Sequence, residues 1–309
     1  MSAIVVENLS KKYGEQLAVD NVSFSVNKGE VVGFIGPNGA GKSSTMRMLT
    51  SYMAPTNGSI IIEGEKIGNE TRHIRKQIGY LPENNPLYTD MAIVDYLHFC
   101  AAIQGVPKKD IRGRIKTMIR LCGINPEKHK RISELSKGYR QRVGLAQAMI
   151  HDPRILILDE PTTGLDPNQI IEIRNLIKEL GKEKTIILSS HILSEVEAIC
   201  DRVIIINKGK IAADSNFEDI RQQAGYRETL TIQIEAKNYA EVEKALLAIP
   251  SIEQVKPDYD NMGNFEIDSK PGMSSRKNIF DLCVKKRWYL LEMTAVESTL
   301  EDVFRKITS

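Results

Sequence analysis

The sequence has no long hydrophobic run. Its longest purely aliphatic stretches, such as Ile155–Leu158 and Val203–Ile206, are far shorter than the roughly 20 residues that span a bilayer. The first eight residues also lack the apolar segment behind a basic start that marks a secretory signal. We therefore expect a chain that does not itself cross a membrane and that is made and kept in the cytoplasm.

Cysteine is scarce, and neither sign of charge dominates. The four cysteines lie far apart with no Cys-x-x-Cys pair, which argues against both a zinc site and a disulfide framework. The 42 basic and 40 acidic residues nearly cancel, so nothing in the balance indicates nucleic acid or a strongly anionic membrane as the main partner. No nucleic-acid partner is expected, and other partners have to be inferred from local features. The cysteines are Cys100, Cys122, Cys200 and Cys283.

Length and composition favour two domains. A chain of 309 residues with 41% hydrophobic content exceeds one typical domain and can bury a core of normal size. Over residues 1–224, short apolar runs typical of strands alternate with stretches at helical spacing, which predicts a parallel sheet with helices. Residues 91–150 carry helical spacing alone and predict a helical insertion. The expected strands cover residues 4–6, 22–26, 31–35, 59–63, 78–82, 155–158, 185–189 and 203–206.

The pattern restarts after about Gly225. The alternation of Leu230, Ile232 and Ile234 with polar residues predicts a half-buried strand, and the segments that follow predict the order βαββαβ of a ferredoxin-like domain over residues 225–309. A Ser-x-x-Glu capping box from Ser298 predicts a last short helix. This domain shows no acid pair, metal cluster or basic patch, so its role stays open between dimer support and regulation.

A glycine-rich segment follows the apolar strand at residues 31–35 and fits the pattern Gly-x4-Gly-Lys-Ser/Thr in the context that this motif requires. Its glycines let backbone N–H groups turn toward one anion, Lys42 supplies charge for the β- and γ-phosphates, and the Ser43 hydroxyl can bind Mg²⁺. The alternative is an ordinary glycine turn. The candidate nucleotide-binding residues are Gly36, Pro37, Asn38, Gly39, Ala40, Gly41, Lys42, Ser43 and Ser44.

Tyr13 lies ahead of this loop in the run Lys-Tyr-Gly. Its ring offers a flat apolar face that can stack on adenine, but a surface tyrosine would look the same in the sequence. Both interpretations stay open.

Asp159 and Glu160 end a four-residue aliphatic strand. Ligands of parallel sheets bind at the carboxyl ends of the strands, so two acids at this place indicate a site, although solvated strand-end acids are the alternative. We expect Asp159 to hold Mg²⁺ through water and Glu160 to orient and polarise the attacking water.

His191 follows the expected strand at residues 185–189. An imidazole there can donate a hydrogen bond to a γ-phosphate, although a histidine at a strand end is more often structural. Its order behind the other motifs favours the catalytic interpretation.

Ser136 and Gly138 lie at the expected start of the helix that runs to Ile150. The free N–H groups and the dipole of such a helix end favour a phosphate, and the simpler interpretation is an N-cap. Since the chain already has one complete phosphate loop, a second anion-binding helix end indicates that it faces a partner's nucleotide.

Residues 1 to about 215 resemble the nucleotide-binding domain of ATP-binding cassette (ABC) proteins, with every motif in order. The resemblance implies an α/β P-loop NTPase fold with an antiparallel β subdomain and a helical insertion, and ATP and Mg²⁺ as cofactors. It implies a head-to-tail homodimer, in which Asp166 lies in a turn that links the two sites. One subunit would contribute Tyr13, the phosphate loop, Asp159, Glu160 and His191, and the other would contribute Leu135, Ser136, Lys137, Gly138 and Tyr139.

The chain departs from the family pattern at two places. Glu83 stands where the family usually has glutamine; a carboxylate there can still reach Mg²⁺ but adds negative charge near the phosphates. The signature reads Leu-Ser-Lys-Gly-Tyr instead of Leu-Ser-Gly-Gly-Gln. Lys137 therefore either adds positive charge for the opposing phosphate or points to solvent, with solvent slightly favoured.

The segment Pro82–Tyr88, the altered signature and the ending Leu300–Phe304 are similar to ATPases of bacterial type-2 exporters, and most of all to the ATPase linked to gliding motility in bacteroidetes. This resemblance implies ATP hydrolysis coupled to transport, a separate transmembrane permease subunit, and a peripheral location on the inner face of the cell membrane. It does not name the cargo.

Two other functions would also use a nucleotide-binding cassette. The alternative function is a soluble ABC ATPase that acts on ribosomes or nucleic acid. Ribosomal members usually carry two cassettes and repair members insert long coiled coils, whereas only 93 positions separate Lys42 from Leu135 here. A non-catalytic nucleotide switch is disfavoured because Lys42, Glu160 and His191 are all present.

Overall fold

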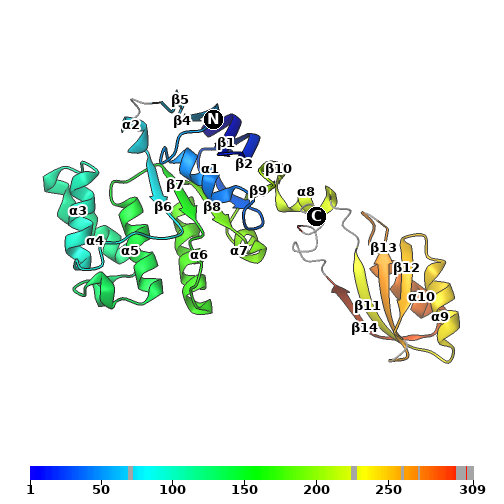
Figure 1. Ribbon diagram of the computed structural model, residues 1–309. Coiled ribbons are helices and arrows are strands. Elements are labelled where there is room, and N and C mark those ends of the chain that lie inside the picture. Colours follow the sequence, from blue (N-terminus) through cyan, green and yellow to red (C-terminus); the bar gives the residue numbers. More distant parts are fainter. Residues whose placement is uncertain (69–71, 224–227, 259–260, 271, 297–303, 305–309) are drawn as a thin grey trace. The chain divides into compact units, whose positions relative to one another are not determined.

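Two units make up the chain in the computed structural model, which describes all residues except 69–71, 224–227, 259–260, 271, 297–303 and 305–309. The first unit covers Met1–Phe217 and the second Glu218–Ser309 (Figure 1). The predicted boundary between residues 224 and 225 lies outside the described residues. No helix in the described part of the chain is long and apolar enough to cross a bilayer.

An antiparallel hairpin opens the first unit. Strands β1 (Ser2–Tyr13) and β2 (Gln16–Asn27) pair along their length, and β4 (Asn57–Ile62) and β5 (Glu65–Lys66) complete a sheet in the order β2-β1-β4-β5. The strands predicted at residues 4–6 and 22–26 were too short. Apolar alternation marks only the buried part, whereas backbone pairing continues through exposed residues such as Lys12, opposite Leu17.

A six-stranded sheet forms the centre of the first unit, in the order β10-β9-β3-β8-β7-β6. The five strands from β9 to β6 run parallel, as the alternation of strands and helices predicted. Parallel strands are usually buried on both faces, which agrees with their continuous apolar runs. The sixth strand, β10, is antiparallel to β9 and was missed. The bounds are β3 (Val31–Ile35), β6 (Ile78–Leu81), β7 (Ile155–Asp159), β8 (Thr185–Ser190), β9 (Arg202–Asn207) and β10 (Lys210–Ser215).

One apolar core joins the two sheets of this unit. Phe34 of β3 and Phe24 of β2 stack with ring centroids 5.7 Å apart, and Met46 of helix α1 (Lys42–Leu49) belongs to the same buried cluster. Alternate residues on β3 face the opposite side, where Gly33 lies against Val196 of α7 (Leu193–Glu197). The phosphate loop between β3 and α1 is therefore anchored at both ends in the core.

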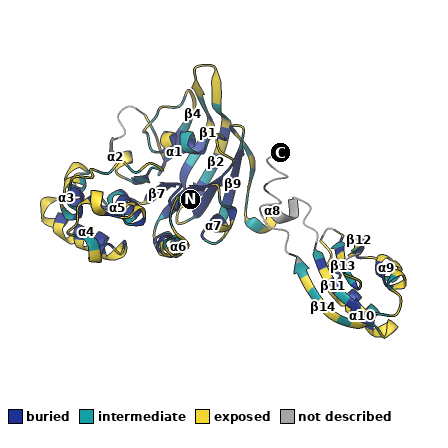
Figure 2. Ribbon diagram, turned by 60° about the horizontal axis from the view of Figure 1, so that its bottom comes forward, coloured by how far each residue is buried: buried dark blue, intermediate teal, exposed yellow. Residues whose placement is uncertain are grey.

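The segment between β6 and β7 is mainly helical, as predicted for residues 91–150. The first unit has α3 (Ile93–Ile103), α4 (Lys108–Leu121) and α5 (Lys137–Met149) grouped at one end of the sheet, with two short 3₁₀ turns, Asn125–Glu127 and Ile132–Glu134, before α5 (Figure 1). Figure 2 shows exposed outer faces on α3 and α4 and buried strands at the centre. The other helices are α2 (Arg72–Arg75), α6 (Pro167–Gly181) and α8 (Phe217–Gln223).

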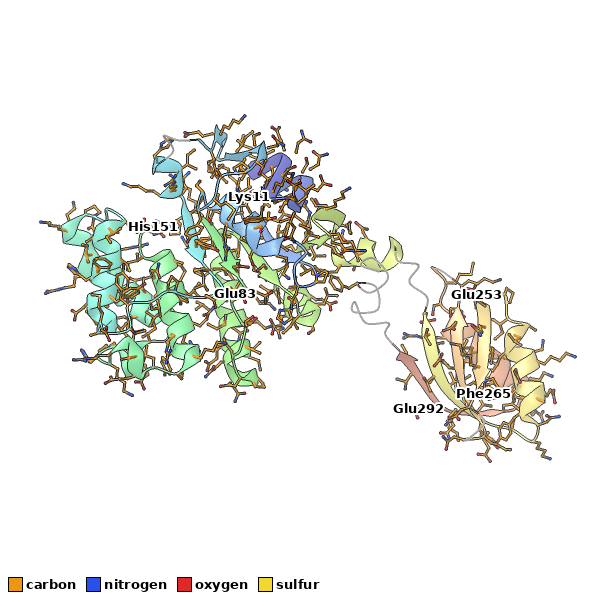
Figure 3. The ribbon with its side chains drawn as sticks, in the orientation of Figure 1. Lys11, Glu83, His151, Glu253, Phe265 and Glu292 are labelled. Atoms are coloured by element: carbon orange, nitrogen blue, oxygen red, sulfur yellow. The ribbon has the colours of Figure 1, made fainter. Side chains whose placement is uncertain are left out.

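The second unit has the expected βαββαβ order. Its strands pair antiparallel in the order β12-β13-β11-β14, and its core includes Phe265, which lies inside the unit, while Glu253 and Glu292 lie on its edge strands (Figure 3). Most of the predicted helix from Ser298 lies outside the described residues. The elements are β11 (Thr229–Glu235), α9 (Tyr239–Leu247), β12 (Ile252–Pro257), β13 (Asn264–Ser269), α10 (Arg276–Lys286) and β14 (Tyr289–Val296).

The close approach of β3 to α7 predicts that Gly33→Ala destabilises the first unit. A Cβ at Gly33 would lie 2.0 Å from Cγ1 of Val196, so we expect a loss of about 1–3 kcal/mol, the usual cost of overpacking, in urea unfolding. Gly113→Ala is the matched control, because nothing lies within 4 Å of its Cβ position on α4 and alanine favours a helix. Equal stability of the two variants would contradict the prediction.

Candidate active site

The phosphate loop at residues 36–41 requires glycine at two of its positions. Gly41, the N-cap of α1, has φ 107°, a backbone conformation that other residues rarely adopt. Gly36 has no room for a side chain, because a Cβ there would lie 2.3 Å from the carbonyl oxygen of Ile206. The sequence motif therefore matches a loop whose backbone, and not its side chains, shapes the surface at the start of α1.

Lys42 is the first residue of α1 and its ammonium is buried within the loop. Its Nζ donates to the carbonyl oxygens of Gly36 (2.8 Å) and Pro37 (3.3 Å) and lies 3.9 Å from Oε1 of Glu160. Burial lowers the pKa of Lys42, and the negative charges of Glu160, Asp159 and Glu83 oppose that shift. At the start of α1, Lys42 is thus close enough to three carboxylates for their charges to act on it.

Asp159 ends β7 and is held by two hydroxyls. Its Oδ1 accepts hydrogen bonds from Ser189 (2.6 Å) and from Ser43 (3.3 Å). Ser189 was not among the predicted site residues. Register explains its place, since Ser189 of β8 lies directly beside Asp159 in the parallel ladder. A hydroxyl at the end of the neighbouring strand was the available signal in the sequence.

Glu160 has a left-handed backbone, with φ 52°, which is uncommon for a residue other than glycine and is often found at functional sites. Its N–H lies 3.0 Å from Ser189 Oγ, and its Oε2 accepts a hydrogen bond from Thr163 (3.1 Å). Only 7% of the residue is exposed. Thr163, also missed in the sequence, therefore holds one oxygen of this carboxylate, while Ser189 holds the backbone of the same residue.

His191 lies directly after β8, with Nδ1 2.8 Å from Oε2 of Glu160. An ionised carboxylate can only accept, so Nδ1 carries the hydrogen in this pair. The imidazole is about half exposed, while the carboxylate is buried. The structure thus brings Lys42, Ser43, Asp159, Glu160 and His191 into one connected cluster, as the motif order indicated.

Tyr13, at the end of β1, also lies close to the phosphate loop. Its hydroxyl is 3.3 Å from Oγ of Ser44 and 3.0 Å from the sulfur of Met53, and Lys11 lies over its ring at 5.5 Å from the centroid. The residue is 41% exposed. A cation already occupies one face of the ring.

The signature turn has a distinct local structure. Ser136 caps α5 by accepting from the N–H of Tyr139 at 3.3 Å, and Leu135 before it is buried. Gly138 is packed so closely that a Cβ would lie 2.3 Å from Oε1 of Gln169. In the described part of the chain, no hydrogen bond or ion pair joins residues 135–139 to the phosphate loop. The structure of one subunit does not bring these two groups of predicted residues together.

Asp166 caps the next helix. Its side chain accepts from the N–H of Gln169 at 2.9 Å, at the start of α6. This local bond explains the residue type at this position without any second subunit.

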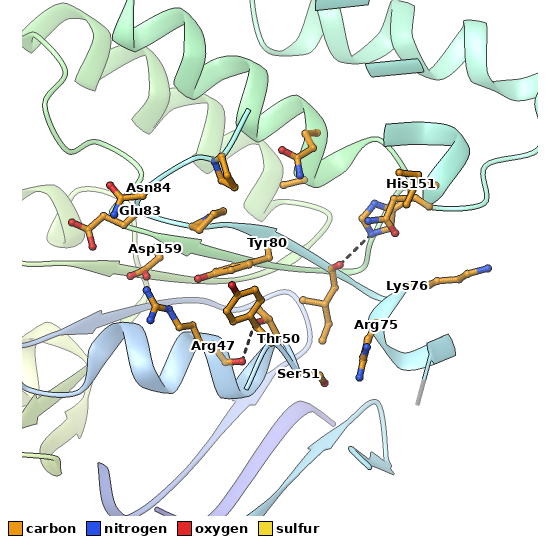
Figure 4. A pocket seen from close by; sticks show the side chains of 18 of the residues that line it. Arg47, Thr50, Ser51, Arg75, Lys76, Tyr80, Glu83, Asn84, His151 and Asp159 are labelled. Atoms are coloured by element: carbon orange, nitrogen blue, oxygen red, sulfur yellow. Dashed lines mark hydrogen bonds between the residues drawn. The ribbon is translucent and has the colours of Figure 1, made fainter. Parts of the chain in front are cut away.

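Glu83 is exposed at the edge of a cavity of about 1030 Å³ in the first unit, beside Arg47 and Asp159 (Figure 4). His151 lies at the far end of this cavity and bonds the carbonyl oxygen of Ile78 (Figure 4). Arg75 and Lys76 add positive charge to the lining.

The segment after Glu83 is anchored to α5. Asn85 donates to the carbonyl oxygen of Arg140 at 3.2 Å and packs on Gly144, where a Cβ would lie 1.8 Å from Asn85 Nδ2. Sequence reasoning missed Asn85, since its role depends on a helix more than 50 positions away. The segment after Glu83 is therefore in direct contact with the helix that carries the signature.

The fold and this cluster define an ATP-hydrolysing nucleotide-binding domain, and comparison with known proteins identifies its family. The ABC transporter family matches residues 19–163. The chain is 36% identical to the bacitracin transport ATP-binding protein BcrA of Bacillus licheniformis over 99% of this chain and 98% of that protein. It is 32% identical to the Nod factor export ATP-binding protein I of Ralstonia nicotianae, over 98% and 92%.

A solved ATP-binding subunit of an ABC transporter has the same fold, with a TM-score of 0.67 and 32% identity over 73% of this chain and 94% of that one. The chain belongs to the ABC transporter family, as an ATP-binding subunit with ATPase activity coupled to transport. ATP-binding subunits of this family form dimers and pair with transmembrane subunits. The predicted fold class and the predicted ATPase activity are thereby confirmed.

The place of Ser189 between the two acids predicts that Ser189→Ala impairs hydrolysis. The change removes the 2.6 Å hydrogen bond to Asp159 and one of the two acceptors of the Glu160 N–H, which keeps the carbonyl oxygen of Ser189 at 3.2 Å, and loss of a buried hydrogen-bond partner costs about 1–3 kcal/mol. We expect kcat for ATP to fall about tenfold or more, measured as phosphate release. Ser194→Ala, on α7, is the control, and an unchanged kcat in Ser189→Ala would show that Ser189 does not position the acids.

Proposed function

We propose that this chain is the ATPase subunit of a type-2 exporter, in which two copies close head to tail around two ATP molecules and drive a separate membrane subunit. One observation carries the proposal. The buried pair Asp159 and Glu160 meets Lys42 and Ser43 of the phosphate loop within hydrogen-bond or ion-pair distance. This cluster has the parts that phosphoryl transfer to water needs, namely a cation, an acid near the loop and a base.

The phosphate loop would bind the nucleotide. The N–H groups at the start of α1 and the ammonium of Lys42 would hold the β- and γ-phosphates, and Lys42 would exchange its bonds to the carbonyls of Gly36 and Pro37 for phosphate oxygens. Tyr13 would contact the adenine with the ring face that Lys11 leaves open.

The donor set around Ser43 fits Mg²⁺. Ser43 and Asp159 supply one hydroxyl and one carboxylate 3.3 Å apart, and Glu83 lies at the edge of the same cavity as Asp159. Among the described residues, no group of three or more His, Cys, Asp or Glu side chains could hold a metal alone. That suits Mg²⁺, which binds through few protein ligands together with water and phosphates. When bound, it would neutralise charge on the phosphate oxygens.

Glu160 would act as the general base. Thr163 and His191 hold its Oε2, and Lys42 lies near its Oε1, so the carboxylate is oriented before a water molecule arrives. With Nδ1–H directed to Glu160, His191 donates to a γ-phosphate only when Nε2 also carries a hydrogen. The pair would then respond to the presence of the phosphate.

The second half of each site would come from the partner subunit. Ser136 and Gly138 lie at the N-terminus of a 13-residue helix, where free N–H groups favour a phosphate, yet no hydrogen bond or ion pair among the described residues joins them to the phosphate loop of their own subunit. A second copy would supply that contact through Leu135 to Tyr139, and the turn at Asp166 would lie between the two sites.

The membrane partner would act through the cavity beside Glu83. The cavity opens next to Asp159, and the segment after Glu83 is bonded to α5, so a partner segment seated there would sense the state of both halves of the site. Relatives named for bacitracin transport and Nod factor export support an exporter. The proposal that the chain belongs to the gliding-motility branch is based on the sequence motifs alone. A location at the inner face of the cell membrane is proposed because the partner is a membrane protein.

Glu160→Gln should keep ATP binding, abolish turnover and trap a dimer. Glutamine has nearly the same shape but cannot take a proton from water, and loss of a general base lowers rates by about 10²–10⁴-fold. Phosphate release and size-exclusion chromatography with ATP measure the two effects. The control is Glu183→Gln, an exposed carboxylate after α6. Hydrolysis at the wild-type rate in Glu160→Gln would refute the assignment.

Glu83→Gln should change the coupling of ATP use to transport. The substitution removes a negative charge that acts on Lys42 and leaves the anchor at Asn85 in place. In vesicles that contain the membrane subunit, we expect fewer molecules transported per ATP hydrolysed. Asp90→Asn, on the same segment, is the control. An unchanged ratio would remove the special role of Glu83.

A further inference from the structure

The side chain of Lys137 lies over Gly164. A Cβ built on Gly164 would lie 1.9 Å from Nζ of Lys137, 2.9 Å from its Cε and 3.3 Å from its Cδ. Gly164 has φ 71°, a conformation that favours glycine, and it has no side chain between its backbone and Lys137. The lysine of the altered signature therefore contacts the turn that follows Glu160 in the same subunit.

This contact is one of three between α5 and the segment that consists of the 162–166 turn and the first part of α6. Gly138 packs against the side chain of Gln169, and Arg142 forms an ion pair with Glu172, both on α6. Helix α5 thus packs against the start of α6 and, through Lys137, against the turn before it. A displacement of α5 would have to move both.

The 162–166 turn reaches the base of the active site. Thr163, next to Gly164, donates to Oε2 of Glu160 at 3.1 Å, and the same oxygen is 2.8 Å from Nδ1 of His191. Contacts therefore run from Lys137 through Gly164 and Thr163 to Glu160. The signature turn would meet the nucleotide bound by the partner. These contacts join it to Glu160, the base that would act on the nucleotide bound by its own subunit.

Charge does not explain the position of Lys137. A cation in the first turn of a helix is opposed by the helix dipole. Its ammonium has no hydrogen bond or ion pair with any residue that the structure describes, and the end of the side chain, from Cδ to Nζ, occupies the space above Gly164. The contact is one of shape.

We propose that Lys137 is a positioning residue, a strut that holds the 162–166 turn and through it sets Glu160 for hydrolysis. It rests on the proposed function, because the signature turn changes its environment only when a second subunit closes on it. Closure against the partner's nucleotide presses Lys137 onto Gly164, and this links the occupancy of one site to the base of the other.

The variants Lys137→Ala, Lys137→Met and Lys137→Arg separate shape from charge. If Lys137 positions the turn, Lys137→Ala is expected to lower kcat about tenfold or more while KM for ATP changes little. The reason is that misplacing a catalytic group affects the chemical step. Methionine restores most of kcat, because its last carbon reaches as far as Cε of lysine. If only arginine restored activity, Lys137 would act as a charge on the partner's phosphate, and the proposal would be overturned.

A double-mutant cycle tests the contact itself. In the wild-type background, the new Cβ of Gly164→Ala meets Lys137, whereas in the Lys137→Ala background that collision is gone. The strain of a positive φ is the same in both backgrounds and cancels. We expect Gly164→Ala to lower kcat at least threefold more in the wild-type background. Equal effects in the two backgrounds would overturn the proposal.

Two controls accompany these measurements on the full-length chain. Lys116→Ala, at an exposed position of α4, is expected to leave kcat and the Hill coefficient for ATP unchanged, whereas Lys137→Ala lowers both. Glu160→Gln is assayed alongside. Hydrolysis in that variant would refute the proposed function, whereas a dead Glu160→Gln with a fully active and cooperative Lys137→Ala would refute only the role of Lys137.

Discussion

The structure of the site depends on the burial of one lysine among carboxylates. Lys42 and Glu160 lie 3.9 Å apart and are both 7% exposed, and Asp159 is 1% exposed. Removing such charges from water is costly unless each finds partners, and the lowered pKa of Lys42 shows that desolvation outweighs the attraction of the acids. The groups stay together because backbone carbonyls, hydroxyls and the imidazole of His191 take up their remaining hydrogen bonds.

The parallel sheet supplies those partners. Strands β3, β7 and β8 lie side by side and end at the same edge, so the phosphate loop, the acid pair and His191 arrive together. Ser189 is the link among them, because it bonds both Asp159 and the N–H of Glu160. Loss of register between β7 and β8 would separate Asp159 and Glu160 from Ser189, His191 and the phosphate loop, so the site depends on the pairing of these buried aliphatic strands.

The sequence allowed the central strands, the phosphate loop and the acid pair to be predicted, because each depends on local pattern. The five parallel strands and the βαββαβ order of the second unit are confirmed. Contacts that depend on tertiary packing were missed: Ser189 needs the register of two strands, Asn85 needs the face of α5, and Lys137 needs the turn at Gly164. Strand β10 was missed because its apolar residues are few and its burial is partial.

The charges of the site are consistent with the proposed closure of two subunits around ATP. Near the phosphate loop, Glu83, Asp159 and Glu160 oppose the single ammonium of Lys42, so the negative phosphates of ATP meet a region that is already acidic. Mg²⁺ would offset part of that charge at Ser43 and Asp159. The rest would come from a partner's α5, whose N-terminus carries a partial positive charge. A carboxylate at position 83 then makes the site depend more strongly on this second source of positive charge than a glutamine would. In the proposed dimer, tight closure around ATP and release after loss of the γ-phosphate would follow from the same balance.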